Sequence, residues 1–502
     1  MKNSNTKEKY QTFIGLEVHI HLITESKVFC GCKNVFGSEP NTNICPVCMG
    51  YPGVLPSLNE EAVKKAYQVA MALNCHLNEK AVFERKNYFY PDMPKNYQIS
   101  QFEFPFGIDG YFDLELADGS TRKIRIHDVH LEEDAGKMIH EGSQSKLDYN
   151  RAGTPLLEIV TEPDLVTGEE AEAFVQQFRQ MVRYLGVTDG NMEEGSLRCD
   201  ANVSINEFGK GLGTKTECKN LNSSRFIKKA LEYEIKRHTK ILNSGEKIIQ
   251  ETRLWDEGSS RTSSMRTKES SNDYRYFPEP DLPPYWPEAD FLVRIKDSLV
   301  ELPKIRKDRF IDEYGLNVQQ ALFLTAEKSM ADFFETVVED GKEDKSLPGT
   351  VASWLGGNVQ KILNDSGLKI EESSLSPKRL LSILNMIKTD KISTGIGKKV
   401  LGLVFEANKD PVDIVNDMGL DEGPDESEIE KIVSDLVDAN PKVADAVRDG
   451  AEKQIGFFMG QVMKATSGKA NPGKIQKLLR EKIFAGSEKG WKRSEKGHIK
   501  AI

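Results

Sequence analysis

The sequence lacks any long apolar run. Its 502 residues are 38% hydrophobic and 29% charged, and no stretch approaches the ~18 consecutive apolar residues of a membrane span. The first residues, MKNSNTKEKYQ, contain no apolar segment of the kind that a signal peptide carries. Cysteine is also scarce, because seven unevenly spaced cysteines in so long a chain do not form a disulfide framework. The sequence therefore predicts a globular cytoplasmic protein with no membrane-embedded part.

Several nucleotide-binding and nucleophile motifs are missing as well. The sequence has no GxxxxGK[ST] loop, no GxGxxG after a strand and no GxSxG turn. These absences argue against a P-loop enzyme, a dinucleotide-binding fold and a serine hydrolase of the α/β type. If ATP binds, we expect the surface of a sheet to hold it through metal ions and basic side chains.

Charge is distributed unevenly along the chain. Asp and Glu number 78 against 68 Lys and Arg, a net charge of −10. Residues 451–502 contain 12 Lys or Arg and 4 Glu, a net of +8, so the first 450 residues carry −18. A basic end on an acidic body is typical of a segment that contacts a polyanion. The alternative is a lysine-rich tail that only increases solubility.

Four cysteines near the N-terminus occur as two close pairs, Cys30-x-Cys32 and Cys45-x-x-Cys48. Paired cysteines separated by a turn-rich loop can place four thiolates tetrahedrally around Zn²⁺. Four protein ligands leave no open position on the metal, so such a zinc would be structural rather than catalytic. The alternative is four free thiols.

Alternating segments predict strands whose polar faces carry acids and histidines. The most informative is the hairpin at 192–223, and similar alternation occurs at 12–22, 123–134 and 151–164. Hard oxygen ligands converging from several strands would suit Mg²⁺. The alternative is a solvated polar sheet face. The predicted magnesium ligands are Glu17, His19, Glu132, Glu158, Asp200 and Glu217.

Residues 83–107 alternate basic and aromatic side chains. Prolines within the segment forbid a long helix. Cations beside aromatic rings suit a nucleotide or an unstacked nucleic-acid end. The alternative is a tyrosine-rich loop that packs on its own sheet. The residues concerned are Arg85, Lys86, Lys95, Tyr88, Phe89, Tyr90 and Tyr97.

Helical periodicity appears at 60–73 and 224–243 and dominates the second half of the chain. Residues 250–284 are polar, rich in arginine and end in a proline cluster, which we interpret as the approach to a domain boundary near 300. The region 303–420 is expected to be wholly helical, and 421–426 to be an acidic linker. The last domain is expected to be helical with a basic final helix. Helices are predicted near 304–314, 317–327, 329–340, 349–364, 376–388 and 394–406.

Seven long motifs resemble the B subunits of tRNA-dependent amidotransferases: IGLEVHIHL, ERKNYFYPDMPKNYQISQ, LEEDAGK, RAGTPLLEIVTEPD, MEEGSLRCDANVSI, KTECKNLNS and DYRYFPEPDLPP. The resemblance implies an α+β fold. An antiparallel-sheet cradle similar to the glutamine synthetase and guanido kinase fold would occupy 1–300, with the zinc loop at 30–48. An all-α domain at 301–420 and a small all-α, tRNA-binding tail domain at 427–502 would follow.

The resemblance also implies a reaction. Family members use ATP to activate the side-chain carboxylate of mischarged Glu-tRNA(Gln), Asp-tRNA(Asn) or both, and then amidate it. The ammonia comes from a separate amidase subunit, and a small third subunit completes a heterotrimer. The sequence has no amidase nucleophile motif, in agreement with this division of labour. Expected cofactors are ATP, Mg²⁺ and structural Zn²⁺.

Roles follow for individual residues. Glu132, Glu158 and Asp200 are the expected catalytic residues. Lys86, Lys95, Arg198 and Lys215 are expected to contact phosphates or the tRNA end. Two alternatives are a metal-dependent hydrolase that acts on RNA and a tRNA-binding subunit without catalytic activity.

Overall fold

The computed structural model describes residues 9–267, 274–419, 426–466, 470 and 472–484. The chain divides into an N-terminal unit, Met1–Ile305, and a C-terminal unit, Arg306–Ile502. The two units have separate hydrophobic cores. None of the described helices is long and apolar enough to cross a membrane.

The N-terminal unit is built on a nine-stranded sheet of order β13-β12-β11-β10-β1-β9-β6-β5-β2. Neighbouring strands are antiparallel, except that β11 and β12 are parallel. Its strands are β1 (Tyr10–His21), β2 (His76–Leu77), β5 (Gly107–Glu115), β6 (Thr121–Glu133), β9 (Pro155–Thr161), β10 (Leu197–Glu207), β11 (Thr216–Lys219), β12 (Glu251–Asp256) and β13 (Arg261–Thr267). Two small sheets contain β3 (Glu84–Asn87), β4 (Tyr97–Ser100) and β14 (Phe277–Pro278), and β7 (Lys137–Glu141) with β8 (Gln144–Asp148).

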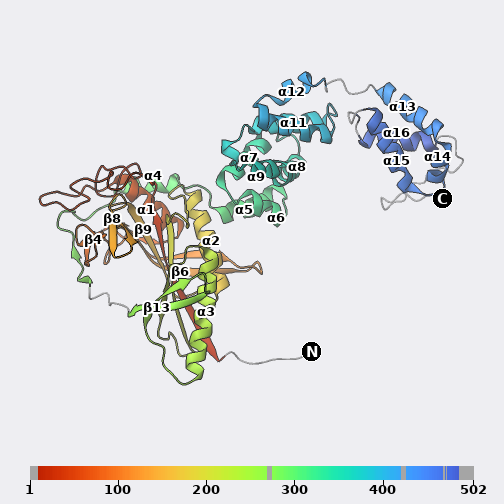
Figure 1. Cartoon of the computed structure of the whole chain (residues 1–502). Coiled ribbons are helices and arrows are strands. Elements are labelled where there is room, and N and C mark those ends of the chain that lie inside the picture. The colour runs from red at the N-terminus through yellow and green to blue at the C-terminus, as the bar shows by residue number, and fades with distance from the viewer. Residues whose placement is uncertain (1–8, 268–273, 420–425, 467–469, 471, 485–502) are drawn as a thin grey trace. The chain divides into compact units, whose positions relative to one another are not determined.

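Helices cover the apolar side of this sheet (Figure 1). They are α1 (Glu60–Ala72), α2 (Gly168–Tyr184) and α3 (Ser224–Asn243), with the short α4 (Ala289–Asp297) following later in the chain. Side chains cap the three long helices, since Asn59, Thr167 and Ser223 each accept a hydrogen bond from a backbone N–H of the first turn. The expected helices at 60–73 and 224–243 are confirmed.

The central strands alternate between buried apolar and half-exposed polar residues. On β1, Leu16, Val18 and Ile20 are buried among the helices, while Glu17 and His19 lie on the opposite face. This alternation confirms the expected strands at 12–22 and in the 192–223 hairpin. It leaves the helix-free face of the sheet lined with charged side chains.

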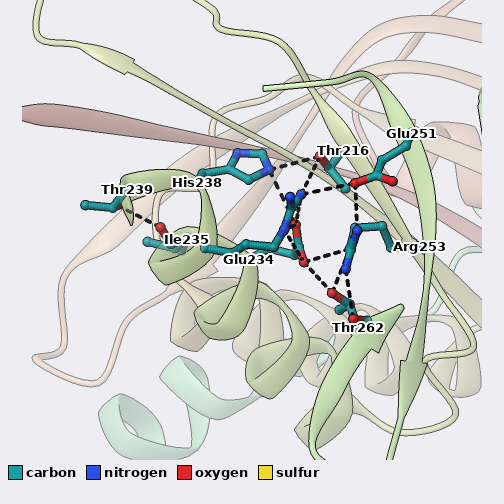
Figure 2. Close-up of polar contacts among 9 residues, drawn as sticks. Thr216, Glu234, Ile235, His238, Thr239, Glu251, Arg253 and Thr262 are labelled. Carbon is teal, nitrogen blue, oxygen red and sulfur yellow. Dashed lines mark hydrogen bonds and ion pairs between the residues drawn. The ribbon is translucent and has the colours of Figure 1, made fainter. Parts of the chain in front are cut away.

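Strands β12 and β13 occupy the polar 250–284 segment, where the sequence predicted no strand. Their residues are mostly polar, with Leu254, Trp255 and Met265 as the apolar ones, so sequence periodicity did not reveal them. A buried polar network holds them against α3 instead (Figure 2). The fully buried Glu234 carboxylate on α3 accepts hydrogen bonds from Arg237 (2.7 Å) and Thr262 and pairs with Arg253 (3.2 Å).

The C-terminal unit is helical throughout its described residues and has two separate hydrophobic clusters. The first joins α5 (Pro303–Tyr314), α6 (Val318–Leu324), α7 (Lys328–Asp340), α8 (Leu347–Trp354), α9 (Gln360–Ser366), α10 (Pro377–Lys388), α11 (Thr394–Ala407) and α12 (Pro411–Asp417). A π-helical turn, Leu355–Val359, connects α8 to α9, so the single helix expected at 349–364 is interrupted. Helix α12 was not predicted.

The second cluster joins α13 (Glu426–Ala439), α14 (Pro441–Arg448), α15 (Ile455–Ala465) and α16 (Pro472–Phe484). Val433, Phe458, Ile475 and Leu479 are buried at its centre. Of the expected linker at 421–426, residues 421–425 lie outside the described residues, and Glu426 begins α13. Residues 485–502 of the basic tail also lie outside them.

Candidate functional site

Strand register brings the predicted acidic and histidine side chains together on the helix-free face of the sheet. Glu17 on β1 lies opposite Asp200 on β10, and His19 lies opposite both Arg198 on β10 and Glu158 on β9. Directly opposed side chains on one face of a sheet are close enough to interact. The result is two groups of potential metal ligands on neighbouring strands.

The first group, the His19 cluster, consists of His19, Glu132 and Glu158, whose ligand atoms lie within 4.8 Å of one another. The imidazole Nε2 of His19 is 3.1 Å from the Glu158 carboxylate, and that of His130 is 3.2 Å from it. Ser100 on β4 donates a hydrogen bond of 3.0 Å to Glu132. Each ligand of this cluster is thus oriented by a neighbouring side chain.

Electrostatics keep this cluster charged. Burial alone would raise the pKa of Glu158, but His19 and His130 lower it well below its usual value. Burial alone would lower the pKa of His19, but Glu158 and Glu132 raise it. The carboxylate of Glu158 is therefore anionic over the physiological pH range.

The second group, the three-carboxylate cluster, consists of Glu17, Asp200 and Glu217, again within 4.8 Å of one another. Asn202 donates to Glu17 (2.8 Å) and Thr252 on β12 donates to Glu217 (2.7 Å). The ammonium of Lys219 contacts Asp200 and lies 3.7 Å from Glu217. The ammonium of Lys219 thus partly neutralises the three carboxylates, whose negative charge favours binding of a cation.

The donor set fits a hard divalent ion such as Mg²⁺. Five of the six ligand residues offer carboxylate oxygens, which Mg²⁺ prefers while it keeps waters and phosphate oxygens as further ligands. Two buried polar atoms nearby, Arg198 Nε and Asn202 Oδ1, have no hydrogen-bond partner among the described residues. Buried polar atoms are normally paired, so these two leave room for a ligand or ordered water.

Arg198 lies on β10 between the two clusters. Its guanidinium donates to Asp134 (2.9 Å), and His21 contacts the same carboxylate at 2.7 Å. The pKa of Asp134 falls far below its usual value because Arg198 and Arg151 outweigh the effect of burial. Arg198 is thus held in place, and its Nε has no hydrogen-bond partner among the described residues.

Lys86, on β3, faces the His19 cluster. Burial disfavours its charge, but the negative potential of Glu132 and Glu158 outweighs burial and raises the pKa of Lys86. The ammonium also lies 5.1 Å from the centre of the Tyr274 ring. The structure therefore brings Lys86 to the cluster as a permanently charged cation.

Two predicted basic residues lie elsewhere. Lys95 is buried in an ion pair with Glu133, beside Cys30 and Cys48 rather than in either cluster. Its contacts fit a structural role, unlike the predicted contact with phosphate or the tRNA end. Lys215 is exposed in the segment before β11, one residue ahead of the strand. Strand pairing begins at Thr216, so Lys215 lies outside the paired strand, whereas Lys219 contacts Asp200.

Sequence reasoning missed several residues that the structure adds to the site. Lys219 and Asn202 stand on the same alternating faces as the predicted ligands, so period-2 spacing contained the signal for both. His130 lies on the same alternating face of β6 as Glu132, so the same spacing contained its signal too. Thr252 carried no signal, because β12 was not recognised as a strand.

The four cysteines of the zinc loop converge. The sulfur atoms of Cys30, Cys32, Cys45 and Cys48 lie within 4.8 Å of one another. Tetrahedral zinc with Zn–S bonds of ~2.3 Å places its sulfurs ~3.8 Å apart, so small shifts would complete the site. The pKa of the Cys48 thiol is lowered to about 4, because hydrogen bonds from Cys30 and from the Cys45 backbone, and the charge of Lys27, outweigh burial.

Lys27 connects the cysteine cluster to the rest of the unit. This fully buried ammonium donates to the carbonyl oxygens of Asn43 (2.8 Å) and Tyr149 (3.4 Å) and lies 3.7 Å from Cys48 Sγ. Four thiolates around Zn²⁺ carry a net charge of −2, which a buried ammonium partly neutralises. The surroundings therefore fit a closed, structural zinc site.

We expect the purified chain to hold about one zinc ion, and Cys45→Ser to loosen the metal and the 28–50 loop. Metal content is measured by elemental analysis of reduced protein, and loop exposure by limited proteolysis. Cys75→Ser is the matched control, since Cys75 is a half-buried thiol outside the cluster. Zinc-free protein from a fresh, reduced preparation would refute this assignment.

Comparisons with known proteins agree with this geometry. Residues 12–292 match the family model described as the GatB/GatE catalytic domain. Residues 332–483 match the model described as the GatB domain. The first match contains every residue of both clusters and all four cysteines of the zinc loop.

Full-length relatives are similar over nearly the whole chain. A protein of Thermodesulfovibrio yellowstonii is 49% identical, covering 95% of this chain and 99% of the relative. Proteins of Persephonella marina (47%, with 94% and 99% covered) and Brevibacillus brevis (46%, with 94% and 98% covered) are similar to the same extent. All three are named as the B subunit of an aspartyl/glutamyl-tRNA(Asn/Gln) amidotransferase. The chain therefore belongs to the GatB family of tRNA-dependent amidotransferase B subunits.

Proposed function

We propose that this chain uses ATP to phosphorylate the side-chain carboxylate of mischarged Glu-tRNA(Gln), Asp-tRNA(Asn) or both, and then forms the amide with ammonia. The observation that carries this proposal is the meeting of the two metal-ligand clusters on the helix-free face of the sheet, in a chain that belongs to the GatB family. It makes the protein a ligase that forms a carbon–nitrogen bond.

The chemistry explains why acids and cations are needed together. A carboxylate is a poor acyl donor, because its leaving group would be oxide. Attack of the carboxylate oxygen on the γ-phosphorus of ATP releases ADP and gives an acyl phosphate. Ammonia then attacks the carbonyl carbon, inorganic phosphate leaves, and the ammonium proton is lost to solvent. Charge spreads over the transferred phosphoryl group, so catalysis consists of positioning and electrostatic stabilisation.

The residues of the site would have three roles: metal binding, phosphate contact and orientation of the carboxylates. Glu132 and Glu158 with His19, and Glu17 with Asp200 and Glu217, would hold Mg²⁺, which supplies positive charge to the phosphates. Arg198 and Lys86 would contact phosphate oxygens from the two sides of the His19 cluster. Lys219, which contacts Asp200, would offer a further cation. His130 and Ser100 orient the carboxylates and touch no substrate.

Architecture and assembly are part of the same proposal. The large, mainly antiparallel sheet, with charged side chains on its helix-free face, supports a cradle like that of glutamine synthetase and guanido kinases, in residues 1–300. The helical domain at 301–420 and the tail domain at 427–502 would dock partners and tRNA. The ammonia source would be a separate amidase subunit, braced by a small third subunit, in the cytoplasm.

Basic side chains of the tail support its contact with tRNA. Lys477 on α16 is mostly exposed, and the described acidic partners of Lys477, Arg480 and Lys482 lie no closer than 3.7 Å. Such long, exposed ion pairs contribute little to stability. These cations can therefore exchange their partners for phosphates at little cost.

Deleting residues 427–502 is expected to weaken tRNA binding and flatten its dependence on salt. Each phosphate neutralised by Lys or Arg releases counterions, so fewer contacts give a smaller slope of log K against log salt. The Michaelis constant for tRNA should rise more than turnover falls. The measurement is tRNA affinity at several salt concentrations.

A substitution series controls for the loss of a whole domain. Replacing Lys474, Lys477 and Lys482 with alanine should reproduce part of the effect, whereas alanine at the bundle residues Lys342, Lys361 and Lys369 should not. If the truncated chain kept the tRNA affinity and salt slope of the full chain, the tail would serve solubility alone.

The direct test of the function is amidation of the two mischarged tRNAs by the purified complex. An ATP-dependent product is expected only when the chain, its amidase partner and glutamine or ammonia are all present. RNA cleavage without ATP would favour a metal-dependent hydrolase. Binding without amidation by the chain's own site would favour a non-catalytic subunit.

A further inference from the structure

Four aromatic rings from two distant segments form a continuous strip beside the His19 cluster. Tyr88 packs edge-on against Tyr274 (6.3 Å between ring centres), and Tyr274 packs edge-on against Tyr276 (6.2 Å). Tyr276 stacks on Phe102 at 4.7 Å with 15° between the ring planes. We call Tyr88, Tyr274, Tyr276 and Phe102 the aromatic strip.

The aromatic strip lies beside Lys86 and the carboxylates of the His19 cluster. Lys86, which faces Glu132, lies 5.1 Å from the Tyr274 ring centre. Ser100, which donates to Glu132, precedes Phe102 by two residues. The pKa of Tyr276 is raised to about 12, chiefly by burial and further by Glu132 and Glu158. The rings therefore lie within the electrostatic reach of the predicted catalytic carboxylates.

Phe102, at one end of the strip, is exposed, but its backbone is held in place. Phe102 remains 56% exposed although one face of its ring is stacked on Tyr276. Its backbone N–H and that of Glu103 both donate to the buried carboxylate of Glu84, at 2.6 and 3.0 Å. The exposed ring is thus held in place before a ligand arrives, which reduces the ordering cost of binding.

We propose that the aromatic strip, with Phe102 at its open end, stacks on an unpaired base at the 3′ end of the tRNA whose aminoacyl group enters the His19 cluster. Unpaired bases characteristically stack on aromatic side chains. Phe102 follows Ser100, the last residue of β4 and a hydrogen-bond donor to Glu132, by two residues, so a base stacked on Phe102 would lie close to the His19 cluster. The inference rests on the proposed function and assigns a binding site for its RNA substrate.

The openness of the strip favours the RNA end over the adenine of ATP. Small-molecule sites usually enclose their ligands, whereas Phe102, at one end of the strip, is 56% exposed. An unpaired end that remains attached to a large RNA body needs such an open surface.

The test is Phe102→Ala in the full complex, with Phe102→Trp as the conservative variant. Phe208→Ala is the matched control, because Phe208 is 66% exposed in the turn after β10. We expect the alanine variant to raise the Michaelis constant for charged tRNA about 10-fold, since a stacked base is worth ~1–3 kcal/mol. The Michaelis constant for ATP should not change, and Phe102→Trp and Phe208→Ala should behave like the parent.

A binding readout separates this inference from the proposed function. tRNA carrying 2-aminopurine in place of its terminal adenine should change its emission on binding to the parent complex, and Phe102→Ala should remove most of that change. This result would support stacking even if the complex did not amidate tRNA. An increase in the Michaelis constant for ATP alone, or parent-like tRNA binding by Phe102→Ala, would overturn the inference.

Discussion

Glu132→Gln is expected to lower ATP-dependent amidation of mischarged tRNA at least about 1000-fold. The substitution keeps the shape of the side chain and its contact with Ser100, but it removes a charged ligand from the His19 cluster. A lost metal ligand commonly costs several kcal/mol of transition-state stabilisation, and ~1.4 kcal/mol is tenfold in rate. Steady-state amidation with saturating ammonia measures the effect without the partner's glutaminase step.

Asp200→Asn should cause a loss of similar size from the second cluster, because it removes both a carboxylate and the ion pair of Lys219. Glutamine hydrolysis by the amidase partner should persist in both variants. Glu207→Gln is the control, since Glu207 lies at the outer end of the same strand and pairs with the exposed Lys210. Parent-like amidation by both cluster variants would place the reactive site elsewhere.

Glu234→Gln is expected to destabilise the N-terminal unit by about 3–5 kcal/mol. Arg237 and Arg253 both depend on this fully buried carboxylate, and removing one partner of a buried ion pair leaves an uncompensated charge. Thermal unfolding followed by tryptophan fluorescence measures the loss, because Trp255 is buried on the neighbouring β12. Glu169→Gln, which breaks an exposed pair with Lys228, should change stability by less than about 0.5 kcal/mol.

The same carboxylate predicts a pH dependence. Burial would raise the pKa of Glu234, but hydrogen bonds from His238, Arg237 and Thr262 lower it from 4.5 to about 2. Its contribution to stability is therefore complete above pH ~4.5 and is lost as the pH falls through 2, a loss of about 3 kcal/mol. The parent should lose stability more steeply between pH 4.5 and 2 than Glu234→Gln. Parallel curves for the two proteins would contradict this account.

Local periodicity predicted much of the site but not its assembly. The two-residue repeat placed Glu17 and His19 on one face of β1 and Asp200 on one face of β10, as the structure has them. Pairing of β1 with β10 joins residues roughly 180 positions apart, and no local pattern specifies such a partner or its register. The convergence of the acids was therefore a hypothesis that the family resemblance strengthened.

The differences between the sequence-based expectations and the structure also arise from contacts between residues far apart in the chain. A lysine such as Lys95 can bind phosphate, but the ammonium of Lys95 is buried in an ion pair with Glu133. Lys215 precedes the first paired residue of β11, and alternation alone did not show that Lys219 is the lysine that contacts Asp200. Strand β12 buries Trp255, but the polar network around Glu234 also holds it, and such a network leaves no periodic signal in the sequence.

Transfer of an oxygen atom from the substrate carboxylate to phosphate tests the central claim most directly. Mischarged tRNA carrying ¹⁸O in both oxygens of its side-chain carboxylate is amidated by the complex with ATP, and the inorganic phosphate is analysed by mass spectrometry. If the two clusters phosphorylate the carboxylate, each phosphate formed with product will contain one ¹⁸O atom, and the other will remain in the amide. Phosphate that contains no ¹⁸O would show that ATP is hydrolysed by water, and would contradict the account.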